Sequence, residues 1–164
     1  MVGDERMKDF SLTPHFGFFE MTTTNHFPLL AQNRKEAELF IDSLKALAIL
    51  LEIIRPVCGP IEIHSGFRGP SLNAAVGSSN KSQHLKGEAA DFSRAGVDSE
   101  KDVDSLFEDV LHTLISDGVS FGQLIREKQD GRYGKLCWAH LSLGVPFREK
   151  EKCGQVLHMH NGVY

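Results

Sequence analysis

The sequence predicts an α+β fold in which helices pack on a small, mainly antiparallel sheet. Two observations indicate this class: helical periodicity is concentrated in two long segments, and short β-like runs follow with few β-α-β alternations. The chain has 164 residues, of which 41% are apolar and 24% are charged. That is the size of one globular domain, and no repeat or long Pro/Gly/Ser linker divides it. We therefore expect a single domain over residues 1–164.

Charge and hydropathy exclude several classes of function. The 18 Lys and Arg residues against 22 Asp and Glu residues give a net charge of −4, and no block of five like charges occurs. A duplex nucleic-acid binder or a polybasic membrane anchor needs a cationic cluster, so we expect neither nucleic acid as a partner nor stable membrane anchoring. The N-terminal sequence MVGDERMKDF is polar where a signal peptide needs an apolar stretch. We expect a monomer, synthesised in the cytoplasm without a signal peptide.

Two segments show the spacing of amphipathic helices. Over 34–54, apolar residues recur at steps of three and four, which is the period of one helix face. Asn33 is expected to cap this helix and Pro56 to end it. A second helix of the same period is expected between Ser99 and Gly118. Both helices are predicted to be scaffold.

Short β-like runs make up most of the remaining chain. They are expected at 61–64, 89–93, 122–127, 135–143 and 155–160. The turn-rich stretch 129–134 predicts an antiparallel hairpin between the third and fourth runs. The stretch 66–87 is rich in Gly, Ser and Asn and predicts a long loop with one short helix near 71–76. Long ordered loops of this kind tend to carry function.

Three residues stand out as candidate metal ligands. His84 and Asp91 lie on either side of Gly87, which permits a sharp reversal before the strand that holds Asp91. His140, on a separate expected strand, can supply a third ligand. Two imidazoles and a carboxylate suit a catalytic zinc, because three protein ligands leave a fourth position open for water. The same spacing also occurs among ordinary loop and sheet residues, so the spacing alone does not decide between these readings.

A longer pattern around these residues resembles a known family. The segment SGFRGPSLNAAVGSSNKSQHLKGEAADF, residues 65–92, closely resembles the signature of the zinc D-Ala-D-Ala peptidases, in particular their small single-domain branch. The compound motif S-x-H-x-x-G-x-A-x-D begins at Ser82, and W-x-H follows about fifty residues later. Similarity extends over nearly the whole chain, from HFGFFEMT through FGQLIRE to CWAHLSL. The resemblance implies a hedgehog/DD-peptidase-like arrangement of the α+β fold.

The resemblance also implies an activity and roles for particular residues. Such enzymes cleave amide bonds in peptidoglycan stem peptides, with a zinc ion that polarises the scissile carbonyl and activates water. Arg68 matches the arginine of the S-G-Y-R element, which implies a catalytic and substrate-binding guanidinium at the oxyanion or a terminal D-alanine carboxylate. Ser82 and Gln83 also match, and they either bind the substrate backbone or support His84, the role we favour. The zinc ligands that the resemblance implies are His84, Asp91 and His140.

The general base is where the sequence departs from better-known members of the family. Many of them carry an acidic residue three positions before the last histidine, and Cys137 occupies that position here. Glu127 is the best replacement because it lies on the strand expected to pair with the strand of His140. A register that places Gln123 opposite His140 would put Glu127 on the same face as His140. Less favourable candidates for the base are Glu88 and Asp130.

Several functional alternatives stay open. The peptidase can be a D,D-carboxypeptidase, or an endopeptidase acting on cross-links or on L-Ala-D-Glu bonds. Without an export signal, a bacteriophage endolysin that reaches the cell wall through a membrane lesion is a natural expectation, and a cytoplasmic D-Ala-D-Ala dipeptidase also fits. A different class is a zinc-stabilised, inactive wall-binding or virion structural module, which Cys137 favours. The H-x-H pair of His158 and His160 is a less favoured source of metal ligands.

Overall fold

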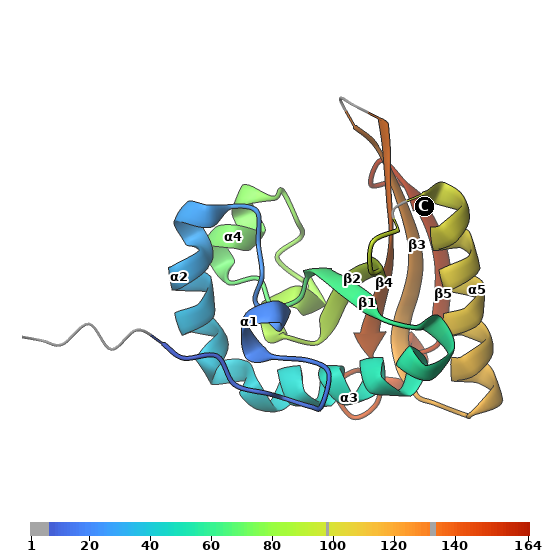
Figure 1. Cartoon of the computed structure of the whole chain (residues 1–164), viewed down its shortest axis with the longest axis horizontal. Coiled ribbons are helices and arrows are strands. Elements are labelled where there is room, and N and C mark those ends of the chain that lie inside the picture. Colours follow the sequence, from blue (N-terminus) through green and yellow to red (C-terminus); the bar gives the residue numbers. More distant parts are fainter. Residues whose placement is uncertain (1–6, 98, 132–133) are drawn as a thin grey trace, which may run out of the picture.

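One sheet flanked by helices makes up the part of the chain that the computed structural model describes, residues 7–97, 99–131 and 134–164 (Figure 1). The helices and 3-10 turns are α1 (Phe18–Met21), α2 (Phe27–Ala37), η1 (Glu38–Phe40), α3 (Ile41–Cys58), α4 (Pro70–Ala75), η2 (Gln83–Lys86), α5 (Glu100–Ser116) and η3 (Lys150–Lys152). The strands are β1 (Ile61–Ser65), β2 (Ala89–Arg94), β3 (Phe121–Gly131), β4 (Gly134–Leu143) and β5 (Gln155–His160). The predicted α+β class is confirmed.

The order of the strands brings distant parts of the sequence together. Across the sheet the order is β1-β2-β4-β3-β5. Neighbouring strands are antiparallel except β3 and β5, which run parallel. Because β2 and β4 are neighbours, Asp91 lies directly opposite His140.

The register between β3 and β4 differs from the expected one. Ile125, not Gln123, lies opposite His140, and Glu127 lies opposite Trp138. The difference is two residues, so the alternation of side chains is unchanged and Glu127 stays on the face of the sheet that carries His140. The shift brings Glu127 closer to His140 than the expected register would.

The position of the hairpin turn explains this shift. A turn over 129–134 was expected to end the strands, but the ladder continues until Gly131 lies opposite Gly134. The turn is therefore centred one residue later than expected, and this moves every pair by two residues along the ladder. The tip of the hairpin, residues 132–133, lies outside the described residues.

The predicted first helix is divided, and both of its expected ends are wrong. Instead of one helix over 34–54, α2 ends before η1 and α3 then begins. Asn33 lies inside α2, where its side chain is buried against other segments and does not cap the helix. Pro56 lies in the last turn of α3, which closes when the Gly59 N–H donates to the carbonyl of Arg55 at 2.8 Å. The chain leaves the helix at Gly59, whose positive φ of 75° suits glycine.

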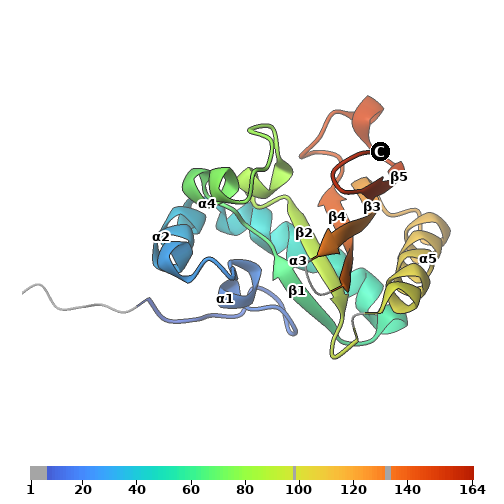
Figure 2. The same ribbon diagram turned by 90° about the horizontal axis from the view of Figure 1, so that it is seen from above.

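The second predicted helix is confirmed, and with α3 it covers one face of the sheet. Ser99 caps α5 by accepting the N–H of Asp102 at 3.2 Å. Helices α3 and α5 pack on each other and on β2 and β4, with α3 crossing beneath the sheet (Figures 1 and 2). The core between these layers includes Leu47, Leu51, Ile54, Leu106, Val110, Phe92, Leu124 and Leu141. This leaves the opposite face of β2, β4 and β3 free to carry polar side chains.

We expect Asn33→Ala to lower the free energy of unfolding by about 3 kcal/mol, because it leaves several buried backbone groups without partners. The Asn33 amide donates to the carbonyls of Thr22 and Phe67, both at 3.1 Å, and accepts the N–H of Gly69 at 2.7 Å. Urea unfolding measures the change. Lys35→Ala, on the exposed side of the same helix, is the matched control and should stay within about 0.5 kcal/mol of the wild type. Equal stability of the two variants would contradict this role for Asn33.

Candidate metal centre

A short 3-10 turn places His84 at the entrance to β2. Ser82 caps this turn, and its side chain accepts the backbone N–H of His84 at 3.3 Å. Gly87 then adopts the left-handed conformation, with φ of 66°, and reverses the chain. A Cβ atom at position 87 would also lie 3.0 Å from Cγ of Leu44. Glycine at this position therefore brings His84 and Asp91 to the same side of the sheet.

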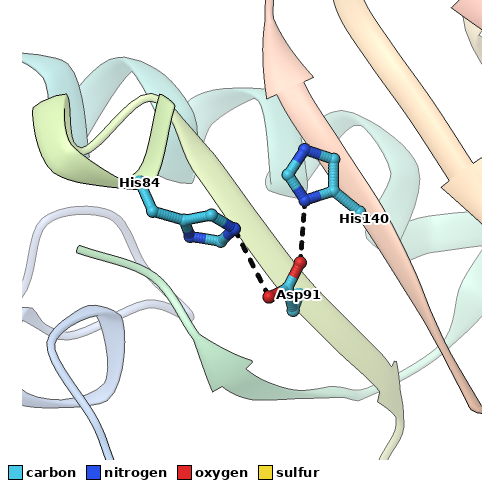
Figure 3. A group of neighbouring side chains, drawn as sticks. All are labelled: His84, Asp91 and His140. Atoms are coloured by element: carbon cyan, nitrogen blue, oxygen red, sulfur yellow. Dashed lines mark hydrogen bonds and ion pairs between the residues drawn. The ribbon is translucent and has the colours of Figure 1, made fainter. Parts of the chain in front are cut away.

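In the imidazole of His84, Nδ1 makes a hydrogen bond and Nε2 has no hydrogen-bond partner. Its Nδ1–H donates to the carbonyl of Gly66 at 2.6 Å. Because a carbonyl only accepts, Nδ1 carries the proton and Nε2 keeps its lone pair. Nε2 is buried without a hydrogen-bond partner and lies 3.3 Å from Oδ2 of Asp91 (Figure 3). A buried lone pair with a carboxylate oxygen beside it is a pair of donors that one metal ion can share.

Asp91 and His140 complete a compact group of donors. Across the β2–β4 ladder, Nδ1 of His140 lies 2.8 Å from Oδ1 of Asp91. The ligand atoms of His84, Asp91 and His140 all lie within 4.8 Å of one another, and the three residues are buried. Figure 3 shows both imidazoles directed at the same carboxylate, one from η2 and one from β4. Two nitrogens and an oxygen in this arrangement fit a three-ligand zinc site.

The charges of the group also favour a cation. Burial raises the pKa of Asp91, but the neighbouring His84 and His140 outweigh burial and hold that pKa well below its usual range. Burial lowers the pKa of His84 and favours its neutral form. At neutral pH the group therefore offers a carboxylate and an imidazole lone pair, which is the protonation state that metal binding needs.

Arg68 and Glu127 lie at the edge of this group. Nη1 of Arg68 is 3.9 Å from Oδ2 of Asp91, and the backbone N–H of Arg68 donates to the carbonyl of His84 at 3.0 Å. Oε1 of Glu127 is 3.9 Å from Nδ1 of His140. Burial and the charge of Asp91 together raise the pKa of Glu127 to about 7. The structure thus brings both predicted catalytic side chains to the candidate ligands.

Cys137 does not face the site. Alternation along β4 places its side chain opposite in direction to His140, and it is buried toward α5 with Glu100 and Lys128 as charged neighbours. Burial raises the pKa of the Cys137 thiol, so it stays neutral. Because it points away from His140, a side chain at position 137 cannot reach the metal ligands, whereas Glu127 can.

The remaining candidates lie in different surroundings. Ser82 supports His84 through the backbone, as described above, whereas Gln83 bonds to Arg148 at 2.8 Å. Glu88 lines the cleft, and Asp130 is exposed beside His160 at 3.2 Å. His158 packs against a ring of α5, so the H-x-H pair lies outside the His-Asp-His group.

The candidate ligands lie in an open cleft of about 820 Å³. Its walls include η2, β3, β4 and the segment that links β4 to β5. Two of its residues, Trp138 and Arg148, were missed as functional candidates. Trp138 could have been found from the sequence, because in W-x-H it shares a strand face with His140. Nothing local in the sequence points to the role of Arg148.

Comparison with known proteins identifies the family. The sequence matches the family described as Peptidase M15 over residues 20–120, which is more than half of the chain and includes His84 and Asp91. The chain belongs to the M15 peptidase family. The predicted resemblance is thereby confirmed, and M15 peptidases are zinc-dependent metallopeptidases. No curated protein matches the chain. Glu127 and His140 lie beyond the matched residues, so only the sheet places them at the site.

We expect Gly66→Ala to weaken zinc binding by about 10- to 100-fold, as changes to groups that orient a metal ligand do. A Cβ atom at position 66 would overlap the carbonyl oxygen of Met21, so the carbonyl that holds the His84 ring must move. Competition with a chromophoric chelator measures the affinity. The control is Gly17→Ala, whose new Cβ finds its nearest neighbour at 3.3 Å. Wild-type affinity in both variants would show that Gly66 does not orient His84.

Proposed function

We propose that the protein is a zinc-dependent hydrolase of amide bonds in peptidoglycan stem peptides, with His84, Asp91 and His140 as the zinc ligands. The observation that carries the proposal is the unpartnered Nε2 of His84, buried beside the Asp91–His140 pair in an open cleft. Membership of the M15 family supports the same activity. When bound, zinc would polarise the scissile carbonyl and lower the pKa of a water molecule.

Glu127 is the general base and acid in this proposal. Its carboxylate faces the cleft beside His140, where it can accept a proton from the attacking water and return it to the departing amine. A pKa near 7 lets one carboxyl group serve both transfers at neutral pH. Arg68 donates hydrogen bonds to the carbonyl oxygen as negative charge develops on it.

We expect Glu127→Gln to lower kcat at least about 100-fold while zinc content stays at the wild-type level, because the amide keeps the shape but cannot accept the proton. Zinc analysis is combined with an assay of purified peptidoglycan for free D-alanine and for new amino groups. Free D-alanine would identify a carboxypeptidase, and new amino groups without it an endopeptidase. The matched control is Glu149→Gln, an exposed carboxylate that lines the same cleft and should leave kcat unchanged.

The alternative proposal, an inactive wall-binding or virion module, predicts a different result in the same assay. Wild-type protein that contains zinc and releases neither product would favour the module. Undiminished activity of Glu127→Gln would instead remove Glu127 from the mechanism. The position of Cys137 on the far face of β4 weakens the argument for the module, because Glu127 supplies a carboxylate at the site.

A role at the cell wall, including that of a phage endolysin, is part of the proposal. Its substrate is the peptidoglycan stem peptide, and the whole chain acts as one zinc peptidase domain. None of the helices in the described ranges combines the length and apolar character needed to cross a bilayer.

A further inference from the structure

The guanidinium of Arg148 is held in place by neutral amide groups. Arg148 lies between β4 and β5, where Nη1 donates to Oε1 of Gln83 at 2.8 Å and Nη2 donates to Oε1 of Gln155 at 3.3 Å. The same oxygen of Gln155 also accepts from Nε2 of Gln123 at 2.9 Å. Side chains from three separate segments therefore fix the position of one positive charge.

No carboxylate within the described residues lies at ion-pair distance from Arg148. Two other half-buried arginines are paired with acids, Arg94 with Asp109 and Arg126 with Asp104, whereas Arg34 stacks on the ring of Phe19. The residue next to Arg148, Glu149, is paired with Lys152 at 2.6 Å. Arg148 thus acts electrostatically on Glu88 and Glu149 without forming an ion pair with either, and its planar guanidinium is suited to a carboxylate.

The backbone is shaped to accommodate this side chain. A Cβ atom at position 122 would lie 2.5 Å from the carbonyl oxygen of Leu143 and 3.3 Å from Cδ of Arg148, so Gly122 is needed first by the neighbouring strand and also lets the arginine stem lie close to β3. The backbone N–H of Arg148 donates to the carbonyl of Gly144 at 3.1 Å. In Figure 2, the segment that leads into η2 and the segment after β4 project from the same side of the sheet. Arg148 is therefore a fixed feature of the cleft wall.

Arg148 and the metal centre line the same cleft, and the hydrogen bonds of Arg148 go to Gln83 and Gln155 and not to the candidate ligands. Gln83, which holds Arg148, is the neighbour of His84 in the sequence. Arg68 lies beside the metal ligands, 3.9 Å from Asp91, and is placed to act at the scissile carbonyl. The two arginines can therefore bind two different groups of one substrate.

We propose that Arg148 is a specificity-determining residue that binds a carboxylate of the substrate, a group separate from the scissile carbonyl. This inference rests on the proposed function and adds that the preferred stem peptide carries a free carboxylate that reaches Arg148. Two carboxylates of a lysine-containing stem peptide offer this chemistry: that of the carboxyl-terminal D-alanine and the α-carboxylate of D-glutamate. Replacing the correct one by a carboxamide removes the charge that Arg148 recognises.

Binding to zinc-loaded Glu127→Gln protein tests the inference without turnover. The chain contains a single tryptophan, Trp138, which lines the cleft, so its fluorescence reports occupancy. Three synthetic stem peptides are compared: one with both carboxylates free, one with a carboxyl-terminal amide, and one with D-isoglutamine in place of D-glutamate. We expect one of the two amidations to weaken binding about 10- to 100-fold, in line with a charge-assisted hydrogen bond. The peptide that loses affinity identifies the carboxylate.

Adding Arg148→Gln to the same protein should remove this discrimination. Peptides that carry the recognised carboxylate should then bind as weakly as the peptide in which it is amidated, whose affinity should not change. Arg148→Lys keeps the charge without the fork and should retain part of the discrimination. The matched control, Lys81→Gln, removes another cation that lines the cleft and should leave the discrimination intact. A purely structural role for Arg148 would weaken all three peptides alike.

The outcomes separate the inference from the proposed function. If the peptides bind but neither amidation matters, or if Arg148→Gln discriminates as well as its parent, the inference is overturned and the proposed function stands. If none of the three peptides binds the parent protein, both are overturned. The comparison of peptides on the parent protein does not depend on the folding of any Arg148 variant.

Discussion

The hydrogen bond from His84 to the carbonyl of Gly66 is the interaction on which the site depends. It fixes the tautomer and the orientation of the ring, and it leaves Nε2 as a buried lone pair beside Asp91. The surrounding contacts hold that carbonyl in place: Gly66 packs on the backbone of Met21, and Asn33 binds the backbone on the far side of the turn. Stability and metal binding are therefore linked, because the contacts that pack the N-terminal helices also orient a ligand.

The sheet positions the other residues of the site, because one of its faces forms the core and the other carries the polar side chains. One face packs on α3 and α5 and forms the core. The alternation of side chains then places Asp91, His140 and Glu127 together on the opposite face. Because neighbouring strands fix their spacing, a carboxylate and an imidazole 49 residues apart in the sequence meet at 2.8 Å. Cys137 follows the same rule and points toward α5.

The sequence was sufficient to predict features that depend on local pattern. Periodicity located α5, and the family resemblance, added to the motif spacing, implied the three residues that the structure brings together. Alternation placed Glu127 on the correct face even though the register was wrong, because an error of two residues preserves the face. The failures have a different origin. The role of Asn33 and the position of Arg148 depend on contacts with segments distant in the sequence, and helix-capping patterns carry no information about them.

Zinc binding by Asp91→Asn protein is the most direct test of the central claim that His84, Asp91 and His140 form one metal centre. Titration against a competing chelator should show one zinc ion per wild-type chain. Asp91→Asn should weaken the affinity by more than about 100-fold, because the carboxylate joins the two imidazoles and supplies the only negative charge among the three. Asp130→Asn, an exposed carboxylate on the hairpin, is the control. Wild-type affinity in Asp91→Asn, or no zinc binding by the wild type, would contradict the account.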